Sequence, residues 1–278
     1  MTERIDSHHH LWKFNQAEYG WIDDRMSLLR RDFMPIALEA ELASTGVDGA
    51  VAVQARQTLD ETNWLLALAD DSPILRGVVG WAAIASDDFG AQLDRLREHP
   101  KLKGLRHIVQ AEPDENFILR ENFNRGIRKL LPTGLVYDIL IYERQLPQAI
   151  QFVDLHPNQV FVVDHIAKAR IADGQLQPWR ENMFALARRE NVYCKVSGMV
   201  TEANWENWTP AQLEPYWDTV VAAFGARRLM FGSDWPVCLV ASRYSTWLQT
   251  VQNWATQLSD SEQDRLFGGT AAEVYRLD

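Results

Sequence analysis

A strand-then-helix rhythm runs through the chain and constrains its fold more than any other feature. Short apolar segments, typical of strands buried on both faces, alternate with longer amphipathic segments. The expected strands are residues 4–8, 49–54, 77–83, 104–108, 135–140, 160–164, 192–197 and 229–232. The expected helices are 35–44, 60–71, 86–99, 120–131, 143–155, 178–190, 209–224 and 242–256, with a last one after residue 259. Such alternation predicts βαβ units around a parallel sheet.

The number of strands and the length of the chain favour a closed barrel over an open sheet. Eight expected strands occupy 278 residues, and (β/α)₈ barrels typically take about 250 residues. No Gly-x-Gly-x-x-Gly pattern follows any expected strand, so a dinucleotide-binding sheet has no support. We therefore expect one domain over residues 1–278, an α/β fold of the (β/α)₈ TIM-barrel type with its active site at the C-terminal ends of the strands.

Charge and apolar content exclude several kinds of partner. The formal net charge is −10 and no long run of Lys or Arg occurs, which argues against nucleic acid. No apolar run reaches the roughly 20 residues of a membrane helix, and no leader pattern opens the chain, so we expect a cytoplasmic protein without a membrane partner. Cys194 and Cys238 alone make no disulfide framework and no cysteine zinc motif. A monomer and a homodimer fit equally well.

Polar side chains end or follow most of the expected strands, where a barrel carries its active site. His8 and His10 are two residues apart, and on a strand such side chains point to the same face. The other members of this set are Gln54, Arg106, His107, Asp138, Asp164, His165, Lys195, Ser197 and Asp234. A shared site at one mouth of the barrel explains why apolar strands repeatedly finish in titratable residues.

His8, His10, His165 and Asp234 form the candidate catalytic centre. An aspartate at a strand end can act as general base toward water, and we assign that role to Asp234. The histidines either ligate zinc or donate hydrogen bonds to a developing oxyanion. The structural alternatives are a buried histidine network and a carboxylate that caps the turn after residue 234.

Six further residues are candidate substrate contacts: Gln54, Arg106, Lys195, Trp21, Trp205 and Trp208. Arg106 offers a planar fork to a carbonyl or carboxylate group, although an internal ion pair with Asp138 is equally expected. Gln54 and Lys195 can hold hydroxyl groups, with a structural role as the alternative. The tryptophans lie in loops after the first and seventh strands and offer flat faces to a ring-shaped ligand, unless they pack as a lid hinge.

Together these residues resemble a known family. The set of His8-x-His10, His165 and Asp234 resembles the amidohydrolase superfamily. Four motifs narrow the resemblance to its amidohydrolase-related branch of sugar lactonases, which are L-fuconolactonase-like or L-rhamnonolactonase-like: Ile5-Asp6-Ser7-His8, Tyr19-x-Trp21-Ile22, Lys195-x-Ser197-Gly198 and Gly232-Ser233-Asp234-Trp235-Pro236. The resemblance covers nearly the whole chain.

The resemblance implies a hydrolase acting on a carboxylic ester, which opens a sugar-acid lactone such as L-fucono- or L-rhamnonolactone by water attack on the carbonyl. It also implies one divalent metal ion, zinc favoured, held by His8, His10, His165 and Asp234, while action without a metal stays open. Binuclear members carry a carboxylated lysine at the end of the fourth strand, where this chain has Arg106. That departure argues against a two-metal centre.

Three other functions stay open beside a lactonase for a small neutral sugar lactone. A metal-dependent decarboxylase of an aromatic or unsaturated acid uses a similar barrel. A lactonase for a dicarboxylate lactone needs several cations at the mouth, where only Arg106 and Lys195 are expected. A ligand-binding barrel without catalysis is the last, and the candidate catalytic centre argues against it.

Overall fold

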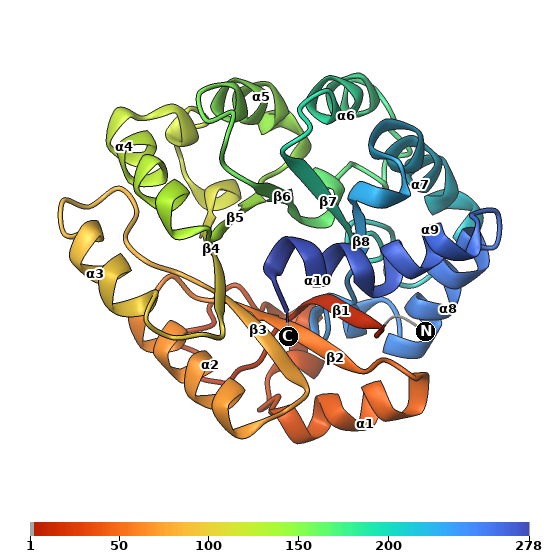
Figure 1. Cartoon of the computed structure of the whole chain (residues 1–278). Coiled ribbons are helices and arrows are strands. Elements are labelled where there is room, and N and C mark those ends of the chain that lie inside the picture. The colour runs from red at the N-terminus through yellow and green to blue at the C-terminus, as the bar shows by residue number, and fades with distance from the viewer. Residues whose placement is uncertain (1–2, 278) are drawn as a thin grey trace.

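Residues 3–277 of the computed structural model form a (β/α)₈ barrel (Figure 1), which confirms the predicted fold class. Its strands are hydrogen-bonded in chain order, and every neighbouring pair is parallel. They are β1 (Ile5–His9), β2 (Gly49–Val53), β3 (Leu75–Gly80), β4 (Leu102–Ile108), β5 (Val136–Leu140), β6 (Phe161–Val163), β7 (Val192–Val196) and β8 (Leu229–Phe231). The ring closes where β1 meets the segment after β8, because the N–H of Asp234 donates to the carbonyl of His8 at 2.8 Å.

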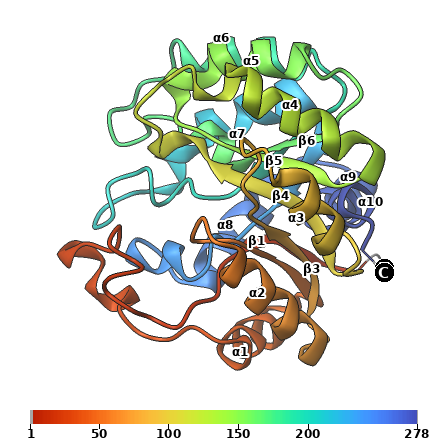
Figure 2. The same ribbon diagram turned by 90° about the vertical axis from the view of Figure 1, so that its left-hand side faces the viewer.

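Helices follow the strands and surround the barrel, except that α10 lies across one end of it (Figure 1). They are α1 (Pro35–Thr45), α2 (Leu59–Asp71), α3 (Phe89–Leu96), α4 (Glu121–Leu130), α5 (Leu146–Asp154), α6 (Trp179–Ala187), α7 (Pro210–Phe224), α8 (Tyr244–Ala255), α9 (Asp260–Asp264) and α10 (Thr270–Tyr275). Figure 2 shows the long loop between β1 and α1 at one end of the barrel and α10 at the other. Within residues 3–277, every helix is too short or too polar to span a lipid bilayer.

The order of the elements matches the prediction, whereas some boundaries shift by a few residues. β3 ends at Gly80 and not at residue 83, because the N–H of Trp81 donates to Oγ1 of Thr62 at 2.8 Å and leaves the ladder. β6 spans only three residues, since the backbone becomes left-handed at His165. Both departures lie at the C-terminal ends of strands, where the chain turns toward the mouth of the barrel.

Inward-pointing side chains fill the barrel in two layers of different chemistry. The layer toward the N-terminal ends of the strands is apolar and contains Ile5, Val51, Val53, Val79, Val136, Val162 and Met230, with Ala271, Val274 and Tyr275 of α10 packed against it. Because side chains on a strand alternate, the residue two positions after Val136 or Val162 faces the same interior, and it is an acid in both strands, Asp138 and Asp164. The second layer therefore carries charge directly below the mouth.

Candidate functional site

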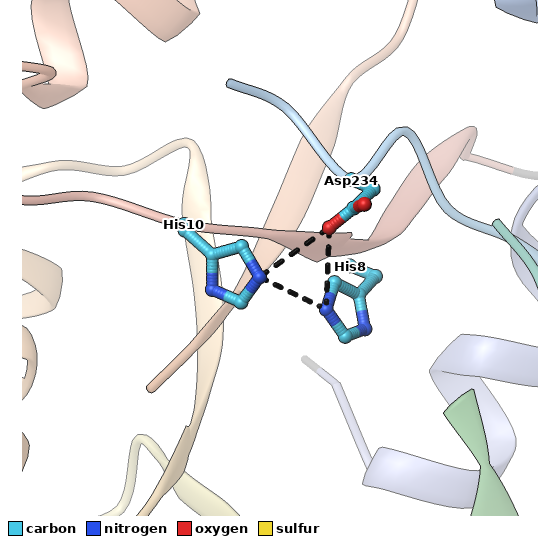
Figure 3. A group of neighbouring side chains, drawn as sticks. All are labelled: His8, His10 and Asp234. Atoms are coloured by element: carbon cyan, nitrogen blue, oxygen red, sulfur yellow. Dashed lines mark hydrogen bonds and ion pairs between the residues drawn. The ribbon is translucent and has the colours of Figure 1, made fainter. Parts of the chain in front are cut away.

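His8, His10 and Asp234 point toward one another at the mouth of the barrel (Figure 3). The Nε2 atoms of His8 and His10 lie 3.2 Å apart. Oδ1 of Asp234 lies 3.4 Å from Nε2 of His10 and 3.9 Å from Nε2 of both His8 and His165. All four side chains are buried. The structure thus brings the four residues of the predicted centre together around one carboxylate oxygen.

Hydrogen bonds behind the imidazoles determine which ring nitrogen faces this cluster. Nδ1 of His10 lies 2.8 Å from the carbonyl oxygen of Val53, which can only accept, so His10 donates from Nδ1 and its Nε2 faces the cluster. Nδ1 of His165 pairs with Oγ of Ser197 at 2.9 Å. Burial lowers the pKa of His165 to about 4, although Asp234 raises it, so this imidazole is neutral near pH 7.

Asp234 differs from the histidines in that it stays charged. Burial pushes the pKa of its carboxyl group upward, but the neighbouring imidazoles of His165 and His10 more than offset this and hold the pKa below its usual value. An ionised carboxylate beside the neutral imidazole of His165 is a set of groups that binds a cation or accepts a proton.

The backbone at two of these residues is left-handed. Asp234 has φ of 57°, and His165 has φ of 52° and begins a run of positive φ values that extends through Ile166 to Lys168. The left-handed conformation costs on the order of 1–2 kcal/mol for each residue other than glycine, and a β-branched residue such as Ile166 rarely adopts this conformation. Gly198 leaves room for the turn, because a Cβ atom there would lie 2.6 Å from Nδ1 of His165. Backbone strain of this kind concentrates at functional sites.

Three donor atoms, from His8, His10 and Asp234, lie close enough together to hold one metal ion, whereas His165 falls in a second group with His8 and Asp164. Zinc binds imidazole nitrogen and carboxylate oxygen at about 2.0–2.1 Å, so two of its ligand atoms lie about 3.3–3.4 Å apart. The separations of 3.2 Å between His8 and His10 and of 3.4 Å between His10 and Asp234 agree with that value. Nη1 of Arg106 also lies 3.3 Å from Nε2 of His8, so the lone pair of this nitrogen has two candidate partners, the guanidinium and a metal ion.

A buried layer of four charged side chains lies below the cluster: Arg106, Asp138, Asp164 and Lys195. Nη1 of Arg106 donates to Asp164 at 2.7 Å, whereas Nζ of Lys195 lies 2.6 Å from Asp138 and 3.0 Å from Asp164. Arg106 therefore has a different partner from the expected Asp138, whose carboxylate is taken by Lys195. Nζ of Lys195 also lies 3.2 Å from Nδ1 of His8, so this layer supports the cluster from beneath.

A cavity of about 420 Å³ opens onto the cluster. Six of the residues singled out in the sequence line it: His10, Trp21, Arg106, His165, Trp205 and Asp234. The rings from the two predicted loops therefore face the same space as the catalytic candidates. The guanidinium of Arg25 lies over the ring of Trp205, 5.3 Å from its centroid, and so links the first loop to the seventh across the mouth.

Gln54, Lys195 and Trp208 lie outside the lining of this cavity. Nε2 of Gln54 donates to the carbonyl of Arg106 at 3.2 Å, and the side chain of Lys195 is fully buried in the charged layer. Nε1 of Trp208 donates to the carbonyl of Ala241 at 2.7 Å, and its ring packs against the hydrophobic core. These contacts favour supporting positions for the three residues.

Sequence reasoning missed several polar residues of the site. Gln110, Tyr142, Lys168 and Glu202 line the cavity, and Tyr275 donates to Asp138 from below. Two of them carried a signal: Lys168 follows His165 by three residues, and Glu202 lies in the loop after the seventh strand, where specificity residues are expected. Tyr275 carried none, because its contact joins segments 137 residues apart.

Known proteins share this architecture. The family model described as "Amidohydrolase" matches residues 5–277. A relative from Burkholderia multivorans named L-fucono-1,5-lactonase is 40% identical and covers 99% of this chain and 96% of its own. A relative of the same name from Burkholderia ambifaria is 36% identical and covers 100% and 97%. A crystal structure of an amidohydrolase from Burkholderia multivorans with bound Zn superposes with a TM-score of 0.96, at 40% identity over 99% of this chain and 100% of the other.

The fold and the cluster define a (β/α)₈ barrel protein with a buried histidine–carboxylate centre at the C-terminal ends of its strands. The full-length match of the family model and the two relatives above 30% identity identify the family: the chain belongs to the amidohydrolases.

Proposed function

We propose that this protein is a hydrolase that opens a sugar-acid lactone, L-fucono-1,5-lactone or a close relative such as L-rhamnonolactone, to its free acid. The observation that carries the proposal is the ionised carboxylate of Asp234, whose Oδ1 lies within 3.9 Å of three imidazole nitrogens beside a cavity. The two full-length relatives named L-fucono-1,5-lactonase support the same class of substrate.

We further propose that His8, His10, His165 and Asp234 hold one divalent metal ion, zinc in the first instance. The separations among His8, His10 and Asp234 support three members of this set. The bound Zn of the similar crystal structure supports zinc as the ion. When bound, zinc would supply Lewis acidity, which lowers the pKa of a water molecule and polarises a carbonyl group.

The side chains of the protein carry the remaining steps. Asp234 accepts a proton from the attacking water molecule while the oxygen of that water bonds to the lactone carbonyl carbon. Arg106, which lines the cavity, donates to the oxyanion that forms. When the bond from this carbon to the ring oxygen breaks, Asp234 returns the proton to the leaving alkoxide, and the new carboxylic acid releases its own proton to solvent.

The remaining predicted residues position these groups and the ring. Trp21 and Trp205 line the cavity and offer flat faces to the C–H surface of a sugar ring. Gln54 holds the backbone of Arg106, and Lys195 holds Asp164, whose Oδ1 lies 3.3 Å from Nδ1 of His8. Trp208 supports the seventh loop through its hydrogen bond to Ala241.

Replacing Asp234 tests the proposal. The Asp234→Asn variant keeps the shape of the side chain but cannot accept the proton, so we expect kcat to fall by about 10²- to 10⁴-fold. Proton release from a panel of L- and D-aldonolactones, with and without prior chelation, measures the rate. The exposed Asp71→Asn change is the matched control and should leave the rate unchanged. Parent-like turnover by Asp234→Asn would rule out this role.

Product analysis separates the alternatives. Lactone opening leaves a new carboxylate, whereas a decarboxylase releases carbon dioxide. A dicarboxylate lactone needs several free cations, but the described lining of the cavity includes only Arg106 and Lys168, which pair with Asp164 and Glu202.

We also propose that the chain acts as one domain, in the cytoplasm, as a monomer or homodimer.

A further inference from the structure

The left-handed turn after β6 directs two side chains into the cavity. His165 begins the turn and Lys168 ends it, and both line the cavity. The N–H of Lys168 donates to the carbonyl of His165 at 2.8 Å, and Nε1 of Trp179 donates to the carbonyl of Ile166 at 2.7 Å. These bonds hold a backbone conformation that L-residues otherwise avoid, and so they fix the positions from which the side chains of His165 and Lys168 start.

The ammonium group of Lys168 faces an acid and a ring across the cavity wall. Its Nζ lies 3.3 Å from Oε1 of Glu202 and 5.6 Å from the centroid of the Tyr142 ring. The side chains of Lys168 and Glu202 are only 19% and 24% exposed, unlike an ordinary surface ion pair. Both also line the cavity that contains Asp234.

This arrangement offers a donor and an acceptor side by side. A lysine ammonium has three donor hydrogens, and the contact with Glu202 uses only one of them. The second oxygen of Glu202 remains an acceptor, and Tyr142 adds an apolar face. Adjacent hydroxyl groups of a sugar ring need this combination, because one hydroxyl can accept from the ammonium while its neighbour donates to the carboxylate.

We propose that Lys168 and Glu202 are the specificity-determining pair of the site, which binds the ring hydroxyls of the lactone and selects sugar lactones over unsubstituted ones. The inference rests on the proposed lactonase function and deepens it. In this role the pair binds the polyol, whereas Asp234 carries the hydrolytic step.

Two substrates that share a reacting ester but differ in hydroxyl groups test the pair. L-fucono-1,5-lactone is the polyol substrate, and δ-valerolactone is the same six-membered ester without hydroxyls. For Lys168→Met and Glu202→Gln we expect kcat/KM on the sugar lactone to fall by about 10- to 100-fold, mainly through KM. On δ-valerolactone the losses should be several-fold smaller for both variants, because no hydroxyl contact is lost and the charge of Lys168 lowers the pKa of Asp234 less than His165 and His10 do.

Controls separate a binding role from a structural one. Lys129→Met, at an exposed position of α4, removes a lysine far from the cavity and should change neither substrate. Equal losses on both substrates would assign the pair a structural role, and unchanged rates on both would remove it from the site; either result overturns the inference. If the parent protein opens no sugar lactone, the proposed function fails first, and this inference fails with it.

Discussion

Glu61, near the start of α2, is a fully buried carboxyl group outside the cluster of His8, His10, His165 and Asp234. Its Oε2 accepts the N–H groups of Ala55 and Arg56 at 3.0 and 2.7 Å, which anchors the loop after β2. Burial raises the pKa of Glu61 to about 7, although the hydrogen bond and charge of Arg56 oppose the shift. The folded protein therefore holds this proton more tightly than the unfolded chain does.

The raised pKa predicts a loss of stability between about pH 4.5 and pH 7. Below pH 4.5 Glu61 is protonated in both states; as the pH rises toward 7 the unfolded chain releases the proton first, so the free energy of unfolding falls. The contribution of Glu61 should fall by roughly 2–4 kcal/mol over this range. Urea unfolding of the parent and of Glu61→Gln at several pH values measures it, because the variant lacks this titration. A constant difference between the two proteins would contradict the assignment.

At the scale of an element, α10 does more than seal the barrel. Its Tyr275 reaches past the apolar layer, and the hydroxyl lies 2.9 Å from both carboxylate oxygens of Asp138. Asp138 in turn holds Lys195, which contacts His8. A helix at the N-terminal end of the barrel is thereby connected to the cluster of His8, His10, His165 and Asp234 at the other end.

Tyr275→Phe removes one hydroxyl from this chain of contacts. Because Asp138 is completely buried, its Oδ1 then lacks a donor, while Oδ2 keeps the ammonium of Lys195, and we expect the free energy of unfolding to fall by about 1–3 kcal/mol. Tyr193→Phe is the control, since Tyr193 packs against the same apolar layer but is only partly buried, and its change should stay within about 0.5 kcal/mol. Urea unfolding measures both, and equal losses would show that the hydroxyl of Tyr275 has no special role.

Residues whose positions follow from local sequence patterns could be predicted, whereas residues placed by tertiary contacts could not. Strand order, and the meeting of His8, His10, His165 and Asp234, could be predicted because alternation and strand ends are local patterns with a fixed geometric outcome. The burial of Lys195 below the cavity could not be predicted. A shift of one residue along a strand, about 3.3 Å, decides whether a side chain reaches the cavity wall or the charged layer. The closeness of Lys168 to His165 in the chain was a signal, but nothing in an Ile-Ala-Lys sequence indicates the left-handed turn that brings Lys168 to the cavity; tertiary packing imposes that turn.

At the scale of the whole molecule, the cluster of His8, His10, His165 and Asp234 joins the first strand of the barrel to the segment after the last strand. His8 and His10 belong to the first strand and the residue after it, whereas Asp234 follows the last strand, more than 220 residues later. The backbone closes at the same place, where the N–H of His10 donates to the carbonyl of Trp235 at 2.7 Å. A metal ion bound to these side chains would therefore cross-link the seam of the barrel.

Zinc should for this reason stabilise the entire fold and not only its mouth. An ion that binds the folded state alone adds about 2.7 kcal/mol when its free concentration is 100 times its Kd. We expect urea unfolding of the chelated protein to shift to higher urea on addition of zinc, with one transition throughout. Asp234→Asn, which removes a charged ligand from the seam, should lose most of this shift, whereas Asp71→Asn should keep it. A zinc shift that survives in Asp234→Asn would place the ion elsewhere. If zinc does not shift the unfolding of the parent protein, the proposed metal site is wrong, and hydrolysis falls to Asp234, Arg106 and the imidazoles alone.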